Sequence, residues 1–187
     1  MPPNEFNRHA LRQHLRQQLQ VDWWGHHGIA HWARVRANGL MLATHTGANR
    51  LVVELFAYFH DARRTNENRD EGHGARGAVL ARQLQGKLIR ASDDEMDLLC
   101  YACEHHSDGI LQGDPTVLTS WDADRLDRGR VGIDPNPRYL CTEAARNDVS
   151  LTRANRRAQS WRDGYDARPE RSSLDACAVA RAHGLRP

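Results

Sequence analysis

Lysine is nearly missing from this chain of 187 residues, and other features that mark nucleic-acid binders are also scarce. Lys87 is the only lysine, the other 25 basic residues are arginines, and the net charge is only +2. Aromatic residues make up 6% of the chain and do not interleave with a basic stripe. The composition therefore argues against a partner that is a long nucleic acid, because such binders carry a strongly basic field with stacking side chains.

Cysteine and long apolar runs are scarce as well. The chain has four cysteines, and the Cys100-x-x-Cys103 pair has no second such pair to complete a structural zinc site. We interpret these two as small apolar residues on one helix face. No apolar run approaches the ~20 residues needed to span a bilayer, and the N-terminus lacks the pattern of a cleaved signal. We expect a cytoplasmic protein with no membrane partner.

The length and the hydrophobic periodicity predict an all-α protein. We expect an N-terminal helix within residues 1–20, a main domain over 21–139 and a C-terminal helical extension over 140–187. Asn4 is the expected cap of the first helix, and Ser92 with Glu95 has the spacing of a capping box. The expected helices cover residues 5–20, about 27–46, 51–59, 73–88, 92–104, 119–127, about 140–162 and 172–183.

The strongest signal is the segment Leu51–Phe59, which is apolar at eight of nine positions and is followed at once by His60 and Asp61. An ionisable pair at the end of a buried element needs partners, since burial of an unpaired charge is costly. Candidate partners elsewhere in the chain are His31, His73, His105, His106 and Asp122.

Each of these candidates lies at or near the end of a predicted helix, and helix ends at one pole of a bundle can meet in one site. His27 and His31 are also four residues apart, which is the spacing of one helical face, and His31 is the better ligand candidate. His31, His60, Asp61 and Asp122 together offer two imidazoles and two carboxylates. Such a set suits a divalent cation: Mn²⁺, Fe²⁺, Ni²⁺, Mg²⁺ or Zn²⁺. Asp124 cannot face the same way as Asp122, and we expect Asp124 and Asp127 to pair with Arg125, Arg128 or backbone amides.

The order of these residues resembles the HD superfamily of metal-dependent phosphohydrolases. The resemblance covers about residues 25–135 and implies an HD-domain-like helical bundle with His31, His60, Asp61 and Asp122 as primary metal ligands. Five ordered segments carry it: His27-Gly-Ile-Ala-His-Trp-Ala-Arg-Val35, Phe59-His-Asp-Ala-Arg-Arg64, Gly72-His-Gly-Ala-Arg-Gly77, Glu104-His-His-Ser107 and Asp122-Ala-Asp-Arg-Leu-Asp127.

The later histidines help to decide which branch of that superfamily the chain resembles. His73, His105 and His106 resemble residues that hold a second metal in the branch that cleaves cyclic dinucleotides. That branch has Gly-Tyr-Pro where this chain has Gly113-Asp-Pro115. We therefore favour one metal, with His73 and His105 contacting phosphate or transferring protons.

We expect a phosphohydrolase that cleaves a phosphate ester or anhydride of a small molecule, most simply a nucleotide, by a metal-activated water. Candidate acid/base groups are Asp61, His105 and Glu67, and Arg64, Arg76 and His73 could bind substrate phosphate. The alternatives are a cyclic-dinucleotide phosphodiesterase with two metals and a nucleotide-sensing module without turnover. The Trp-rich segment around Trp23 and the C-terminal helices could form an interface in a homo-oligomer.

Overall fold

The computed structural model describes residues 6–167, and over this range the chain is all-helical. The expected helix over 172–183, Cys177 and the expected cap Asn4 lie outside the described residues. The elements are α1 (Arg8–Gln18), α2 (Ile29–Thr46), α3 (Arg50–Phe59), α4 (His73–Leu84), α5 (Asp93–His105), α6 (Pro115–Arg125), η1 (Arg128–Val131), η2 (Pro137–Tyr139), α7 (Glu143–Arg146) and α8 (Asp148–Asp166).

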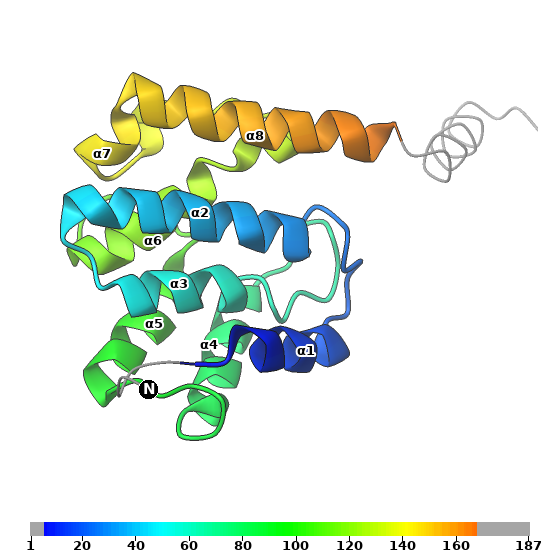
Figure 1. Ribbon diagram of the computed structural model, residues 1–187, viewed down its shortest axis with the longest axis vertical. Coiled ribbons are helices and arrows are strands. Elements are labelled where there is room, and N and C mark those ends of the chain that lie inside the picture. Colours follow the sequence, from blue (N-terminus) through cyan, green and yellow to red (C-terminus); the bar gives the residue numbers. More distant parts are fainter. Residues whose placement is uncertain (1–5, 168–187) are drawn as a thin grey trace, which may run out of the picture.

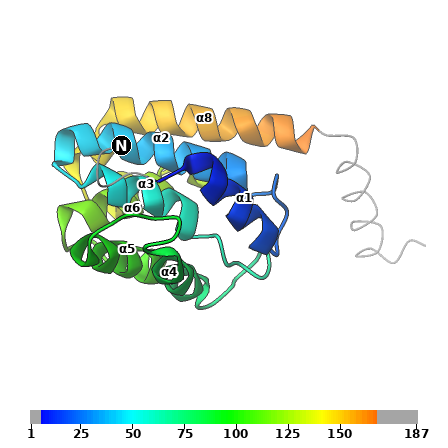
Figure 2. The same cartoon turned by 60° about the horizontal axis from the view of Figure 1, so that its bottom comes forward.

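Helix α3 is the centre of the bundle, as its apolar sequence predicts. Residues 52–59 are all buried, and Asn49 caps the helix by accepting from the backbone N–H groups of Leu51 and Val52. Helices α2, α4, α5 and α6 pack around it, while α8 runs along α2 on the outer side (Figure 1). The second view shows α4 and α5 side by side on the opposite side of the molecule from α8 (Figure 2). A helix enclosed in this way delivers its C-terminal residues, His60 and Asp61, into the protein interior.

Helix boundaries follow capping residues, and this moves some ends from their expected places. The capping box of Ser92 and Glu95 is present as predicted. Helix α1 begins at Arg8 because Asn7 caps it. Helix α6 begins at Pro115, earlier than expected, because Asp114 is its cap and proline suits the first helical turn. The expected helix over 140–162 is two helices, α7 and α8, separated at Asn147.

Two glycines allow α4 to pack closely on its neighbours. An added Cβ at Gly74 would lie 2.1 Å from the carbonyl oxygen of Cys103 on α5, and one at Gly77 would lie 2.2 Å from that of Phe59 on α3. Larger side chains at these positions would push the helix away. The two glycines thus bring His73, the first residue of α4, close to Asp61 and His106.

None of the described helices is both long enough and apolar enough to cross a membrane.

Candidate metal centre

Four histidines converge from the ends of four helices. His31 lies in the first turn of α2, His60 follows the last residue of α3, His73 begins α4 and His106 follows the last residue of α5. All four are buried, and His31 and His60 have no exposed surface. The prediction that helix ends meet in one site is confirmed for these four.

Each of these imidazoles has its Nδ1 atom next to an acceptor that cannot donate. The Nδ1 atom of His31 lies 2.7 Å from Asp127 Oδ2. The other three face backbone carbonyl oxygens: His60 at 3.1 Å from Phe56, His73 at 2.5 Å from Asp70 and His106 at 2.7 Å from Cys103. Each Nδ1 must therefore carry a proton and donate it. In the neutral ring that leaves Nε2 as a bare lone pair.

The bare Nε2 atoms face each other in two pairs. His31 and His60 approach to 3.0 Å, and His73 and His106 to 2.9 Å. Two lone pairs at that distance repel unless a positive charge lies beside them. Either a proton or a metal cation satisfies the arrangement, and carboxylates placed around it decide how strongly it attracts positive charge.

Asp61 connects the two histidine pairs through its two carboxylate oxygens. Its Oδ2 atom lies 3.4 Å from the Nε2 atoms of both His31 and His60. Its Oδ1 atom lies 3.3 Å from the Nε2 atom of His73. Although burial raises the pKa of this carboxyl, its contacts with His60, His31 and His73 outweigh burial and hold the pKa well below its usual range. Asp61 is therefore a carboxylate shared between the pairs.

Asp124 completes the first pair. Its Oδ1 atom lies 3.3 Å from His31 Nε2 and 3.9 Å from His60 Nε2. Burial and the nearby Arg130 lower the pKa of His31, but hydrogen bonds to Asp124, Asp127 and Asp61 raise it to about 9. His60 has its pKa lowered to about 3, chiefly by burial. The position between the two rings thus attracts a single positive charge strongly.

The first pair with its carboxylates, named here the primary group, consists of His31, His60, Asp61 and Asp124. The donor atoms of the histidines and Asp124 all lie within 4.8 Å of one another, as do those of a second group made of Asp61, His73 and His106. The primary group offers two imidazole nitrogens and two carboxylate oxygens, which fits Mn²⁺, Fe²⁺, Ni²⁺ or Zn²⁺. The donor types are those of the predicted ligand set, but Asp124 takes the place of Asp122.

That exchange corrects the expectation for Asp122. Both oxygens of its carboxylate are occupied on the other side of α6: Oδ1 accepts from the backbone N–H of Cys141 at 2.7 Å, and Oδ2 accepts from the backbone N–H and hydroxyl of Thr142 at 2.8 Å. Asp122 anchors the segment after η2, and Asp124 takes the expected ligand position. The expected pairing of Asp124 and Asp127 with Arg125, Arg128 or backbone amides is also wrong, since both carboxylates face His31. Asp127 holds the Nδ1–H of His31 and accepts two hydrogen bonds from Arg34.

The structure places His105 and Glu67 outside the cluster. The His105 Nδ1 atom lies 2.7 Å from Asp108 Oδ2 at the surface, so its neighbour His106 is the histidine that reaches the interior. The Glu67 Oε2 atom lies 2.5 Å from the Nδ1 atom of His27. His27 precedes α2, so the expected shared helical face of His27 and His31 is wrong.

The two predicted phosphate-binding arginines already have protein partners. Arg64 donates from its Nη1 atom to Asp61 Oδ1 at 3.2 Å and lies at the same distance from His73 Nε2. It therefore holds Asp61 and places a positive charge in the second group. Arg76 binds Asp70 at 2.6 Å and the carbonyl oxygens of Arg63 and Glu71, so it stabilises the loop before α4.

Two cavities open beside the cluster, and His106 and Ser107 line both. One, of about 340 Å³, also contacts Asp124, and the other, of about 480 Å³, also contacts Arg64 and His73. The buried cluster is thus reached from outside on two sides.

No model of a protein family, no curated protein and no solved structure matches this chain.

Proposed function

We propose that this protein is an HD-type metal-dependent phosphohydrolase that cleaves a phosphate ester or anhydride of a small molecule, with nucleotides as the favoured class. The observation that carries the proposal is the primary group: two buried imidazoles with bare Nε2 atoms facing two carboxylates. The order of its members along the chain, His31, His60-Asp61 and a later aspartate, adds the resemblance to the HD superfamily. That aspartate is Asp124.

The residues of the primary group would hold the cation, and Asp127 would hold His31 in the tautomer that binds it. When bound, such a cation lowers the pKa of a coordinated water towards ~7 and stabilises negative charge on a phosphoryl oxygen. Arg64 orients Asp61 by donating to Oδ1. Asp124 has the other carboxylate beside the bare nitrogens, and 19% of its side chain is exposed, towards the smaller cavity. It is the member of the group that faces an arriving substrate.

The second group favours a two-metal form of the same chemistry as the second candidate. His106 Nε2 lies 2.9 Å from the bare nitrogen of His73 and shares the second group with Asp61, so a second cation would satisfy it. Arg64 opposes this because its guanidinium lies against both His73 and Asp61. We therefore place the tightly held cation in the primary group and a weaker one in the second. A cyclic-dinucleotide phosphodiesterase would need both.

The test is product analysis after metal is stripped and Mn²⁺ is restored. The panel comprises nucleoside mono-, di- and triphosphates and cyclic dinucleotides, and Asp61→Ala is run beside the native protein. Asp163→Ala, an exposed aspartate on α8, is the matched control. We expect metal-dependent release of phosphate or pyrophosphate in the native protein and the control, and none in Asp61→Ala. Full turnover in Asp61→Ala would refute the proposal, and binding of nucleotide without product would identify a sensor.

A further inference from the structure

The two cavities beside the cluster differ in the charge they present. The larger is lined by four carboxylates, Asp70, Glu71, Glu104 and Asp108. Only two arginines, Arg64 and Arg69, stand against these four carboxylates in its lining, and both are paired, Arg69 with Glu71 at 2.6 Å and Arg64 with Asp61. A phosphorylated ligand would meet net negative charge there. The larger cavity is therefore poorly suited to the anionic part of a substrate.

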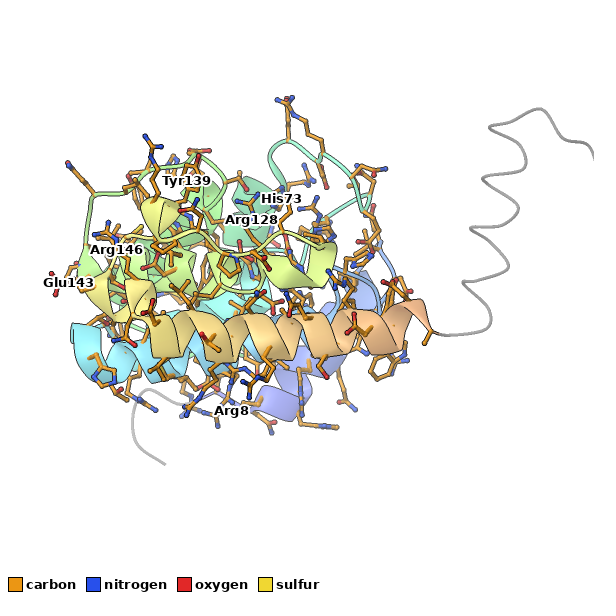
Figure 3. The ribbon with its side chains drawn as sticks, turned by 90° about the horizontal axis from the view of Figure 1, so that it is seen from above. Arg8, His73, Arg128, Tyr139, Glu143 and Arg146 are labelled. Atoms are coloured by element: carbon orange, nitrogen blue, oxygen red, sulfur yellow. The ribbon has the colours of Figure 1, made fainter. Side chains whose placement is uncertain are left out.

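The smaller cavity offers the opposite chemistry. Among residues 6–167, no acceptor or carboxylate partners the guanidinium of Arg128, and this side chain is exposed at the cavity wall. Tyr139 and Leu111 line the same cavity and are 57% and 38% exposed. In the view from above, Arg128 is drawn between Tyr139 and His73 (Figure 3). One cavity thus combines a free cation, an aromatic ring and the cluster member Asp124.

The protein fixes the wall that carries Tyr139. Arg125 donates to the carbonyl oxygens of Tyr139 and Ile110, both at 3.1 Å, and thereby joins the two rims of the cavity. Leu140 is buried in a core cluster, and Asp122 holds the next two residues through their backbone N–H groups. Interactions at Tyr139 and at the residues that follow it preorganise its backbone, which lowers the entropy lost when a ligand binds.

We infer that this cavity is the nucleoside-binding part of the substrate site, with Tyr139 stacking on the base and Arg128 binding a phosphate. The volume of about 340 Å³ is within the range of small-molecule sites. A tyrosine face accepts any base, and an unpaired guanidinium binds phosphate oxygens in a bidentate manner. The inference rests on the proposed function for the identity of the scissile phosphate. What the inference adds is the part of the substrate beyond that phosphate, which is an aromatic group.

The test measures binding, so that it does not depend on turnover. The ligands are the phosphonate analogues of adenosine 5′-monophosphate and of ribose 5-phosphate, whose C–P bond resists hydrolysis, titrated by calorimetry into Mn²⁺-loaded protein. We expect the adenosine compound to bind about tenfold more tightly, because base–aromatic stacking contributes on that order. Tyr139→Ala should abolish this difference and Tyr139→Phe should keep it.

Arg128→Gln should weaken both analogues by a similar factor, about threefold to tenfold, because it contacts the phosphate that they share. Arg138→Gln is the matched control: Arg138 is an exposed arginine beside Tyr139 that does not line the cavity, and its removal should change neither affinity. Equal affinities for the two analogues in the native protein would overturn the inference. So would failure of both to bind, or an undiminished preference for adenosine in Tyr139→Ala.

The two proposals fail separately. If the adenosine analogue binds through Tyr139 and no phosphate compound is hydrolysed, the cavity assignment stands and the proposed function is wrong. If phosphate esters are hydrolysed with no preference for an aromatic group, the function stands and the cavity assignment is wrong.

Discussion

Asp122 and Asp124 are two residues apart on α6, and their carboxylates serve opposite sides of the helix. Asp124 lies 3.3 Å from the Nε2 atom of His31, whereas Asp122 accepts hydrogen bonds from the backbone of Cys141 and Thr142. An α-helix turns about 100° per residue, so this separation places the two side chains about 200° apart. Asp124 therefore belongs to the candidate metal centre, whereas Asp122 holds the segment that follows η2.

Substitution of these two aspartates should have different consequences. Asp124→Ala removes a cluster carboxylate, and we expect metal affinity to fall by more than about 100-fold with the fold intact. Asp122→Asn places an amide NH₂ group against backbone donors, so we expect a loss of about 1–3 kcal/mol in unfolding free energy with one cation still bound. Metal analysis and thermal melting of both variants provide the check. If Asp122→Asn binds no metal and melts at the normal temperature, Asp122 is the metal ligand and the assignment of Asp124 is wrong.

Metal stoichiometry should separate the two histidine groups. We expect the native protein to bind one cation tightly and a second more weakly, because Arg64 adds positive charge to the second group. His106→Ala should keep the tight cation and lose the weak one, while His31→Ala should lose the tight one. Titration of stripped protein with Mn²⁺, followed by elemental analysis, measures this. If His106→Ala still binds two cations, the second cation is not held by the second group.

The hydrogen bond from His31 to Asp127 should set the metal affinity without direct contact. In Asp127→Asn the amide can present its NH₂ group to Nδ1 and so favour the tautomer with the proton on Nε2. We expect metal affinity to fall about 10- to 100-fold with little loss of helix content. The affinity is measured by competition with a chelating dye. Arg34→Gln, which removes a partner of Asp127 but leaves the His31 contact, should have a smaller effect.

Acid should loosen the attachment of α1. Glu54 on α3 is 6% exposed and accepts from Arg8 at 2.7 Å and from Arg36 at 2.6 Å. Burial raises its pKa, but these arginines outweigh burial and lower it below the usual value of 4.5. A carboxylate with a lowered folded-state pKa contributes stability above its unfolded pKa and loses it as the pH falls through the folded value.

We therefore expect Glu54→Gln to lower the free energy of unfolding by about 1–2 kcal/mol at pH 7. The value is small because Arg8 is half-exposed, so solvent screens the pair. Near pH 3 the loss should be smaller still. Urea unfolding at the two pH values measures the difference. Asp97→Asn removes an exposed pair with Arg82 and should change stability by less than about 0.5 kcal/mol at either pH. An equal loss for both variants would show that burial does not matter here.

Two helical glycines should respond in opposite ways to alanine. Gly77→Ala drives a Cβ against the carbonyl oxygen of Phe59, and we expect a loss of about 3 kcal/mol because α4 must move. An added Cβ at Gly164 in α8 meets nothing within 4 Å, so Gly164→Ala should add about 0.5–1 kcal/mol through helix propensity. Thermal or urea unfolding of the pair gives the comparison. Stabilisation by Gly77→Ala would refute the close packing.

Much of the fold could be predicted from local pattern. The apolar run over 51–59 would permit a strand at Val52-Val53 but favoured a buried helix, which the structure has. Ser92 and Glu95 marked a helix start. Boundaries were missed where a cap lay outside the apolar pattern, as with Asn7 and Asp114. Capping depends on which side chain actually reaches a free N–H group, and several polar residues near each end could do so.

The sequence by itself determined that His60 and Asp61 follow a buried helix, and hence that they would need partners in the interior. Only the tertiary structure decided which partners arrive. The cluster receives His106 rather than His105, and Asp124 rather than Asp122. Each step along a helix turns the side-chain direction by about 100°, so residues one or two positions apart face different sides. The rotation of each helix about its axis is set by packing against the others, through contacts such as those of Gly74 and Gly77. A list of candidate ligands follows from local pattern, whereas selection among them follows from helix packing.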